Sequence, residues 1–427
     1  MKKLKEFFQQ KKKAKPQENI YFLRKRLFAV LFIFVMLLAF ITNIKESGQV
    51  IKQEVEKRVQ AVVNKDLTLR EGVSKIEDAM VSNLAGRMKY IEIFSYTQNV
   101  LGKREINNFD LIKDETGSLH YASFYKNQNE NCFEYAMRVK RLKDYVSQYG
   151  TDVLFVVAPS KFITNDRRTS QDMPVNDPQV LVDETLFYLN RLGIETLDLN
   201  CYIPNKEVPY EQAFFKSDHH WTIPAAFCAT KILADTLNER FDYNLDTQKY
   251  LASEQFRKIT YKDVMLGSMG RRSGANYSGL DDMTAIYPNY HIQCNRHTLE
   301  EYGGYSDKSG DIMGTLISTE ALEQSDIYKG SPYDMYINGL RTYEHIENES
   351  IEDGKTFFMI RDSYFSPVIT FMTPMVKQID AVWSLEESEQ IDIENLIKSE
   401  KYDCIVIEMY PYNIEDEAFR YFLEEEE

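Results

Sequence analysis

Three apolar runs constrain the fold of this chain more than any other feature of its sequence. They read VLFVVAP (153–159), KTFFMIRDS (355–363) and DCIVIEMY (403–410), and patterns typical of helices lie between them. Runs of this kind are typical of strands buried on both faces, and such strands alternating with helices form βαβ units. The sequence therefore predicts an α/β fold with a parallel sheet covered on both faces. Functional residues of such sheets gather at the carboxyl ends of the strands.

Weaker signals complete the expected element order. A long polar stretch, residues 240–350, interrupts the alternation and is expected to form an insertion or lid. Apolar alternation around Thr116 and Gly117 predicts a β-hairpin. The remaining expected elements are strands at 194–200 and 378–385 and helices at 131–150, 178–192, 222–241 and 393–400, followed by a final helix.

The N-terminal region has the pattern of a membrane anchor. Residues 1–26 carry ten lysines and arginines against two glutamates, although the whole chain has a net charge of −15. A run without polar residues follows, and the apolar stretch 27–44 is long enough to cross a bilayer as a helix. No small-residue cleavage site follows it. We therefore expect a cytoplasmic tail at 1–26, a transmembrane signal anchor at 27–44, a helical stalk at 45–94 and a body at 95–427 outside the cytoplasm.

Several classes of function lack support in this sequence. The acidic body argues against a nucleic-acid partner, because phosphate contacts need a basic surface. No glycine-rich nucleotide-binding loop occurs, and the five cysteines form no CxxC pair or zinc-ligand spacing. Candidate catalytic residues must therefore be sought outside nucleotide-binding loops and cysteine clusters.

Ser363 is the first candidate, because the expected strand 355–363 delivers it to the carboxyl edge of the sheet. A serine between a strand and a helix can point its hydroxyl outward, while neighbouring backbone N–H groups bind a negative oxygen. The alternative is a helix cap, which is a common role for an Asp-Ser pair.

The segment FFKSDHHWTIP supplies a second candidate, formed by Asp218 and His220. A serine nucleophile needs a histidine base, and the base needs an acid that fixes its tautomer. His219 is an alternative base, and Asp218 is alternatively a helix N-cap. A metal site is a further alternative, but the remaining four histidines are scattered without ligand spacing. We therefore expect no metal.

At these residues the chain resembles a known family. FFKSDHHWT is similar to the motif of the membrane-anchored bacterial proteins of the DHHW family, which resemble the SGNH-hydrolase-like, alginate-type polysaccharide O-acetyltransferases. VLFVVAPSKFIT, IRDSYFSP and DCIVIEMYPYN resemble the strand, serine and late-strand segments of these proteins. The resemblance covers about residues 95–425. It implies an SGNH-like three-layer sandwich, circularly permuted, because the Asp-His pair precedes the serine.

The resemblance also implies roles for individual residues. It makes Ser363 the nucleophile, His220 the general base and Asp218 the acid that orients it. The usual glycine before the Asp-Ser pair is Arg361 here, a departure that bears on the oxyanion hole. We also expect oxyanion or substrate contacts from Arg361 itself and from Tyr364, Tyr410 and Asn413. Arg271 and Arg272 in the loop GSMGRRSG are expected to hold an acidic glycan, and the alternative for this segment is a flexible solvated loop.

The function implied is acetyl transfer through a serine ester to hydroxyls of a cell-surface or secreted polysaccharide, without a cofactor. The expected acetyl donor is a membrane-bound O-acyltransferase, and the expected place is the cell membrane with the catalytic domain outside. Two alternatives stay open. One is an acetyl-polysaccharide esterase with the same three residues, and the other is an inactive, anchored glycan-binding or assembly protein.

Overall fold

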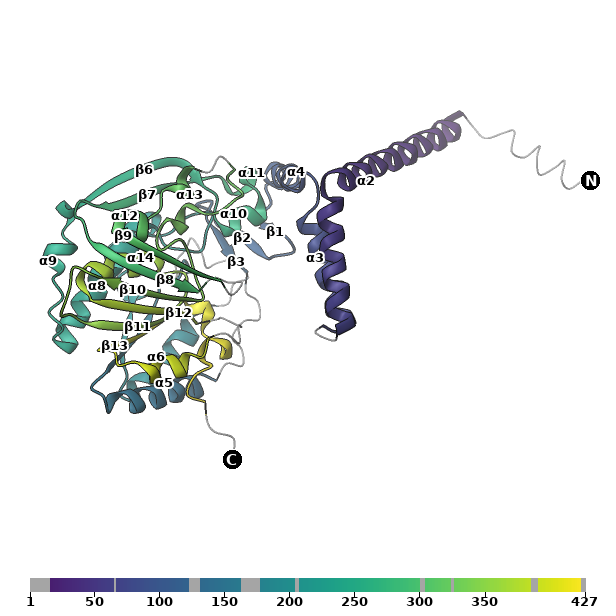
Figure 1. The fold of residues 1–427 in the computed structure, drawn as a ribbon. Coiled ribbons are helices and arrows are strands. Elements are labelled where there is room, and N and C mark those ends of the chain that lie inside the picture. The colour runs from purple at the N-terminus through teal and green to yellow at the C-terminus, as the bar shows by residue number, and fades with distance from the viewer. Residues whose placement is uncertain are drawn as a thin grey trace, which may run out of the picture. The chain divides into compact units, whose positions relative to one another are not determined.

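The computed structural model describes residues 16–64, 67–122, 131–162, 177–203, 207–299, 304–323, 326–384 and 391–423. Most of the basic tail, residues 1–15, lies outside the described residues. The chain forms two compact units, Met1–Ile91 and Glu92–Glu427. Figure 1 shows the N-terminal helices and the larger α/β unit.

Two helices dominate the N-terminal unit. Helix α2 (Pro16–Asn64) contains a segment, Tyr21–Lys45, that is long and apolar enough to cross a membrane. Helix α3 (Leu69–Ser82) follows and begins with a capping box, in which Thr68 and Glu71 satisfy each other's backbone N–H groups. Helix α4 (Arg87–Val100) contains the boundary between the two units. The apolar helix expected from the sequence is therefore present, and it suggests a membrane anchor or a signal sequence.

The larger unit is built on an eight-stranded sheet with the order β5-β4-β13-β11-β12-β10-β8-β9. The first five strands in this order pair in parallel with one another, and every pairing from β12 onward through the last three strands is antiparallel. The strands are β4 (Asp152–Val157), β5 (Glu195–Asp198), β8 (Gln293–Leu299), β9 (Tyr305–Asp311), β10 (Tyr343–Asn348), β11 (Thr356–Arg361), β12 (Gln378–Trp383) and β13 (Cys404–Met409).

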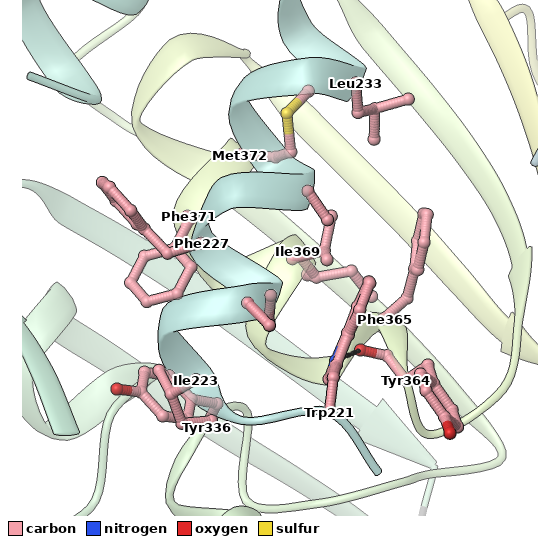
Figure 2. Close-up of a cluster of buried hydrophobic side chains, with 14 of the residues drawn as sticks. Trp221, Ile223, Phe227, Leu233, Tyr336, Tyr364, Phe365, Ile369, Phe371 and Met372 are labelled. Atoms are coloured by element: carbon pink, nitrogen blue, oxygen red, sulfur yellow. Dashed lines mark hydrogen bonds between the residues drawn. The ribbon is translucent and has the colours of Figure 1, made fainter. Parts of the chain in front are cut away.

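Helices cover both faces of the parallel part, which makes three layers. Alternate residues of β4 and β13 point into two separate cores, as expected for strands buried on both faces. One core contains α8 (Ile223–Phe241) and α14 (Phe365–Met372), whose packing is shown in Figure 2. The other contains α5 (Cys132–Ser147), α6 (Gln179–Arg191) and α15 (Ile393–Ser399). The predicted SGNH-like α/β fold is confirmed.

The stretch 240–350 differs from the expected insertion, because part of it extends the central sheet through β8, β9 and β10. β8 and β9 are rich in polar residues and lack a continuous apolar run, so their sequence gave no buried-strand signal. The rest forms an antiparallel pair and short helices: β6 (Phe256–Met265), β7 (Asp281–Pro288), α9 (Thr247–Tyr250), α10 (Ser268–Ser273), α11 (Ala275–Ser278), α12 (Ile312–Thr315) and α13 (Glu320–Glu323).

Two smaller features flank the sheet. The predicted hairpin is present as β2 (Leu111–Lys113) and β3 (Leu119–Tyr121), joined by β1 (Glu105–Ile106) into a three-stranded sheet. The final helix expected from the sequence is wrong for the described part of the C-terminus, where Pro411–Asn413 and Asp416–Phe419 form short 3-10 turns. Pro411 lacks the backbone N–H that a continuing helix would need.

Candidate active site

The structure brings Asp218, His220 and Ser363 together at the carboxyl edge of the sheet. Ser363 lies between β11 and α14, and the other two lie in the loop before α8. His220 Nε2 is 2.7 Å from Ser363 Oγ, and His220 Nδ1 is 2.7 Å from Asp218 Oδ1. The chain of contacts from acid to imidazole to hydroxyl is the arrangement that activates a serine nucleophile.

The loop that carries Asp218 and His220 is held by local hydrogen bonds. The short helix α7 (Tyr210–Ala213) precedes it, and an antiparallel bridge joins Phe214 to Trp221 across its base. Asp218 Oδ1 also accepts the backbone N–H of His220 at 3.0 Å, so the acid fixes both the backbone and the ring of the histidine. Both histidine nitrogens thus have defined neighbours.

Asp218 remains a carboxylate despite its burial. Burial alone disfavours its ionised form, but the neighbouring His220 and His219 outweigh burial and hold the pKa of Asp218 well below its usual value. Asp218 Oδ2 accepts the backbone N–H of Ser268 at 2.6 Å. A Cβ on Gly267 would stand 2.3 Å from the Asp218 Cβ, so only glycine permits this close approach of the 267–274 segment.

His220 is enclosed by aromatic rings. Its ring stacks on Tyr333 at 4.2 Å, and Tyr333 Oη accepts the Trp221 Nε1–H at 3.0 Å. Burial, together with the nearby charge of His219, lowers the pKa of His220. A lowered pKa keeps the imidazole neutral and able to accept a proton under mildly acidic conditions. Tyr333 lies in a short 3-10 helix (Pro332–Met335) far from any motif, so no signal in the sequence identifies it.

Lys161 is a second residue whose position sequence reasoning missed, although its PSK segment was part of the resemblance. Its buried ammonium group donates to the backbone carbonyls of Leu119, Phe215 and Asp218 at 2.7–2.8 Å, and to that of Lys216 at 3.3 Å. Burial lowers the pKa of Lys161 to about 8. Lys161 therefore binds hairpin strand β3 and the Asp218 loop to the end of β4.

Asp362 fixes the turn that presents Ser363. Its carboxylate accepts the backbone N–H groups of Tyr364 at 2.9 Å and Tyr410 at 2.8 Å, and the Asn413 side-chain amide at 3.0 Å. Its own backbone N–H donates to Glu408 at 3.0 Å. Burial beside Asp362 raises the pKa of Glu408 well above its usual value, so Glu408 is a neutral acid here.

Most of the groups that were expected to bind the oxyanion therefore form hydrogen bonds within the protein instead. Asn413 and the Tyr410 backbone bind Asp362, and the Tyr364 hydroxyl donates to the backbone carbonyl of His219. The Tyr364 and Tyr410 rings stack at 4.8 Å. Within the described residues, the backbone N–H of Ser363 is recorded in no hydrogen bond, which leaves it available to an oxyanion.

Arg361 points away from the nucleophile. It is fully buried on the sheet, where its guanidinium pairs with Glu344, which also binds Arg296 Nε at 2.9 Å. The expectation that Arg361 contacts the oxyanion or the substrate is thus contradicted by its burial in this charged network. Arg361 stands where the family pattern has a glycine before the Asp-Ser pair, and its side chain lies outside the site.

His219 lies beside the relay but outside it. Its Nδ1 is 3.2 Å from Ser268 Oγ and 3.1 Å from Asp218 Oδ1. Of the two histidines, His220 is the one whose ring nitrogen lies within hydrogen-bond distance of the Ser363 hydroxyl. Asp218, His219 and His220 also form a three-residue group with ligand atoms within 4.8 Å of one another. No fourth protein ligand joins them in the described ranges, and His220 Nε2 is directed at Ser363 instead.

The two arginines of the 267–274 segment have different environments. Arg271 Nη1 donates to the backbone carbonyls of Leu266 at 3.2 Å and Gly330 at 2.9 Å, so part of its guanidinium holds neighbouring loops. Arg272 is exposed, pairs with Asp110, and lies over the Tyr121 ring at 5.8 Å. The Tyr121 ring is 6.0 Å from that of His219, which places Arg272 on the rim beside the histidines.

Comparisons with known proteins agree with the resemblance in the sequence. A model of the SGNH hydrolase-like domain of the acetyltransferase AlgX matches residues 119–285. Comparison with curated proteins gives no match. Among solved structures, PatB1 of Bacillus cereus is similar at 14% identity, with a TM-score of 0.58, over 73% of this chain and 99% of that chain.

A DHHW family protein from Eubacterium siraeum is similar at 13% identity, with a TM-score of 0.50, over 70% of this chain and 91% of that chain. PatB1 with a sulfonyl adduct is similar at 14% identity, with a TM-score of 0.57, over 75% of this chain and 99% of that chain. At these identities the structural matches show the fold. The chain therefore carries an SGNH hydrolase-like domain, as the resemblance implied.

Proposed function

We propose that this chain, which carries an SGNH hydrolase-like domain, is a membrane-anchored O-acetyltransferase that works outside the cytoplasm. In this proposal an acetyl group passes through an ester on Ser363 to hydroxyls of a cell-surface or secreted polysaccharide. The observation that supports it most is the continuous relay from Asp218 through His220 to Ser363, with 2.7 Å at each step.

The first half-reaction loads the serine. His220 Nε2 accepts the Ser363 hydroxyl proton while Oγ forms a bond to the acetyl carbonyl carbon of the donor. The carbonyl oxygen becomes negative, and the backbone N–H of Ser363 would donate a hydrogen bond to it. Collapse breaks the donor's C–O bond, and the leaving oxygen takes the proton from His220.

The second half-reaction transfers the acetyl group from Ser363 to the acceptor. A sugar hydroxyl gives its proton to His220 and attacks the acetyl carbon, and Ser363 Oγ leaves and recovers the proton. Asp218 stays ionised throughout, because its low pKa keeps it a carboxylate that stabilises the imidazolium. An esterase would use the same steps with water in place of the sugar.

The acceptor site would lie on the rim next to His219. Arg272 offers an exposed guanidinium there, and an acidic sugar would complement it. The acetyl donor would be a membrane-bound O-acyltransferase, since acetyl-CoA is confined to the cytoplasm. The apolar segment Tyr21–Lys45 would hold the chain in the same bilayer as that partner.

The burial of Arg361 concerns the alternative that the chain is an inactive, anchored glycan-binding or assembly protein. The arginine that replaces the expected glycine does not fill the site, so this departure gives no support to a silent protein.

The test measures acetyl transfer directly. The purified full chain would be incubated with p-nitrophenyl acetate, with and without an acetyl-free acidic oligosaccharide, and nitrophenol release and acetylated sugar would both be measured. A transferase releases nitrophenol faster with the acceptor and yields acetylated sugar. Release unchanged by the acceptor, with free acetate as the product, would identify an esterase instead.

A further inference from the structure

A buried charged network crosses the neighbouring strands β11, β12, β10 and β8 of the large sheet. Arg361 at the end of β11 donates to the Glu344 carboxylate on β10 at 2.5 Å, and Arg296 on β8 donates to the same carboxylate at 2.9 Å. On β12, which lies between β11 and β10, the residue opposite Glu344 is the small Ala381. The three charged residues are at most 4% exposed. We call them the Arg–Glu–Arg network.

One end of the network lies next to the nucleophile. Arg361 directly precedes Asp362, whose carboxylate fixes the turn that presents Ser363. The Arg361 backbone carbonyl accepts the N–H of Ser384 at 2.9 Å, which holds the end of β11 beside the end of β12. The network is therefore attached to the strand end that carries the serine.

The other end holds a strained segment. Arg296 Nη2 donates to the backbone carbonyl of Ile337 at 2.5 Å. Ile337 and Asn338 have φ values of 46° and 54°, in the left-handed region that a β-branched residue rarely adopts. Such a conformation persists only where its surroundings fix it. The bond from Arg296 fixes it here, together with the bond from the Ile337 N–H to the Leu316 carbonyl at 2.6 Å.

The same segment carries the ring that stacks on the base. It begins with the 3-10 helix Pro332–Met335, which contains Tyr333. The Tyr333 ring is tilted by only 21° from that of His220, and its hydroxyl donates to the backbone carbonyl of Tyr364 at 3.2 Å. Tyr364 directly follows Ser363. The path from the serine turn through the network and Tyr333 therefore ends at the base of the same relay.

We infer that the Arg–Glu–Arg network positions the relay: it holds the segment of Tyr333 in a fixed place relative to the end of β11, so that the His220 imidazole faces the Ser363 hydroxyl. For its catalytic part the inference rests on the proposed function. Stability alone does not account for three buried charges, because well-packed apolar residues stabilise a core equally well. Directed, charge-assisted hydrogen bonds add a defined geometry.

The test separates position from stability with two variants of the full chain. Arg296→Lys keeps the charge beside Glu344 but lacks the planar fork with which arginine reaches both the carboxylate and the Ile337 carbonyl. The combined variant Arg296→Met, Glu344→Leu and Arg361→Met removes the whole network, so that no charge stays buried without a partner. The two variants thus loosen the same segment at different cost to the core.

Arg240→Lys is the matched control. Arg240 also joins a glutamate to a backbone carbonyl, since it donates to Glu195 at 3.0 Å and to the carbonyl of Thr196 at 2.8 Å. It lies on the surface, away from the relay. Its replacement should change neither of the two readouts.

The first readout needs no catalysis. Trp221 is fully buried, and its Nε1–H donates to the Tyr333 hydroxyl, so its emission reports the position of Tyr333. The chain has two tryptophans, and Trp383→Phe in every variant leaves Trp221 as the single emitter. We expect acrylamide to quench this emission more strongly in Arg296→Lys and in the combined variant than in Arg240→Lys.

The second readout is the rate of nitrophenol release from p-nitrophenyl acetate. We expect kcat to fall about tenfold in Arg296→Lys while KM stays within about twofold, because misplaced groups slow the chemical step more than they weaken binding. In the combined variant, kcat should stay low although the melting temperature is at least that of Arg296→Lys.

Either readout equal to that of Arg240→Lys would overturn the inference, and so would a combined variant whose kcat recovers with its stability. Absence of nitrophenol release from the unsubstituted chain would instead count against the proposed function. The quenching of Trp221 would then still decide whether the network holds Tyr333.

Discussion

Two adjacent histidines have different tasks because their rings meet different neighbours. His220 connects Asp218 to Ser363, whereas His219 faces Ser268 and the rim. The two rings are only 3.9 Å apart, so a charge on His219 is felt by His220. Burial and this charge both lower the pKa of His220. In the proposed mechanism, His220 is therefore the base and His219 is a residue that lowers its pKa.

This tuning predicts the pH dependence of acylation. The neutral form of His220 accepts the serine proton, so a lowered pKa preserves the rate as pH falls, and the acid limb should have its midpoint below about 6.5. His219→Gln removes the charge that lowers the pKa of His220, so the midpoint should move to higher pH. The rate of nitrophenol release from p-nitrophenyl acetate, measured between pH 4 and 9 in steps of about half a unit, would show it.

His291→Gln is the control for this measurement, because His291 is exposed and pairs with Asp311 on another part of the fold. Its profile should match that of the unsubstituted chain. A midpoint that moves to lower pH in His219→Gln would contradict the assignment.

At the scale of elements, the site depends on Lys161 holding three segments together. Lys161→Met keeps the length of the side chain but removes the donor to three buried carbonyl groups, those of Leu119, Phe215 and Asp218. Unsatisfied buried groups are costly, and we expect a loss of about 3 kcal/mol in the free energy of unfolding. Acylation should slow as well, because the loop of Asp218 loses its support.

Thermal unfolding and the acylation rate of Lys161→Met would be compared with those of Lys216→Met. Lys216 is exposed in the same loop, so its substitution should change neither quantity appreciably. If Lys161→Met unfolds and reacts like the control, the ammonium does not organise the loop.

The buried parallel strands were predictable from sequence, because β4, β11 and β13 carry continuous apolar runs. Strands β8 and β9 were missed, since antiparallel pairing at the sheet margin tolerates polar residues. The proximity of Ser363, His220 and Asp218 was predictable, because these motif residues follow a strand or precede a helix. Tyr333 and Lys161 depend on contacts with sequence separations of 113 for the Tyr333–His220 stack and 57 for the Lys161–Asp218 bond, and no local pattern encodes them.

At the scale of the whole molecule, the proposed orientation places the larger unit outside the cytoplasm. Cys201 is an exposed cysteine of that unit, so a membrane-impermeant maleimide should label it in intact cells. Cys201→Ser should lose most of the label. Labelling that requires permeabilised cells would reverse the proposed orientation.

The central claim is that Ser363 carries the acetyl group, and the most direct measurement is the mass of the protein itself. The full chain would be quenched with acid during turnover of p-nitrophenyl acetate and analysed intact and after proteolysis. We predict one added acetyl group on the peptide that contains Ser363, its loss in Ser363→Ala and His220→Ala, and its persistence in His219→Ala and in Ser268→Ala. An unmodified Ser363 during turnover, or an adduct that survives Ser363→Ala, would contradict the account.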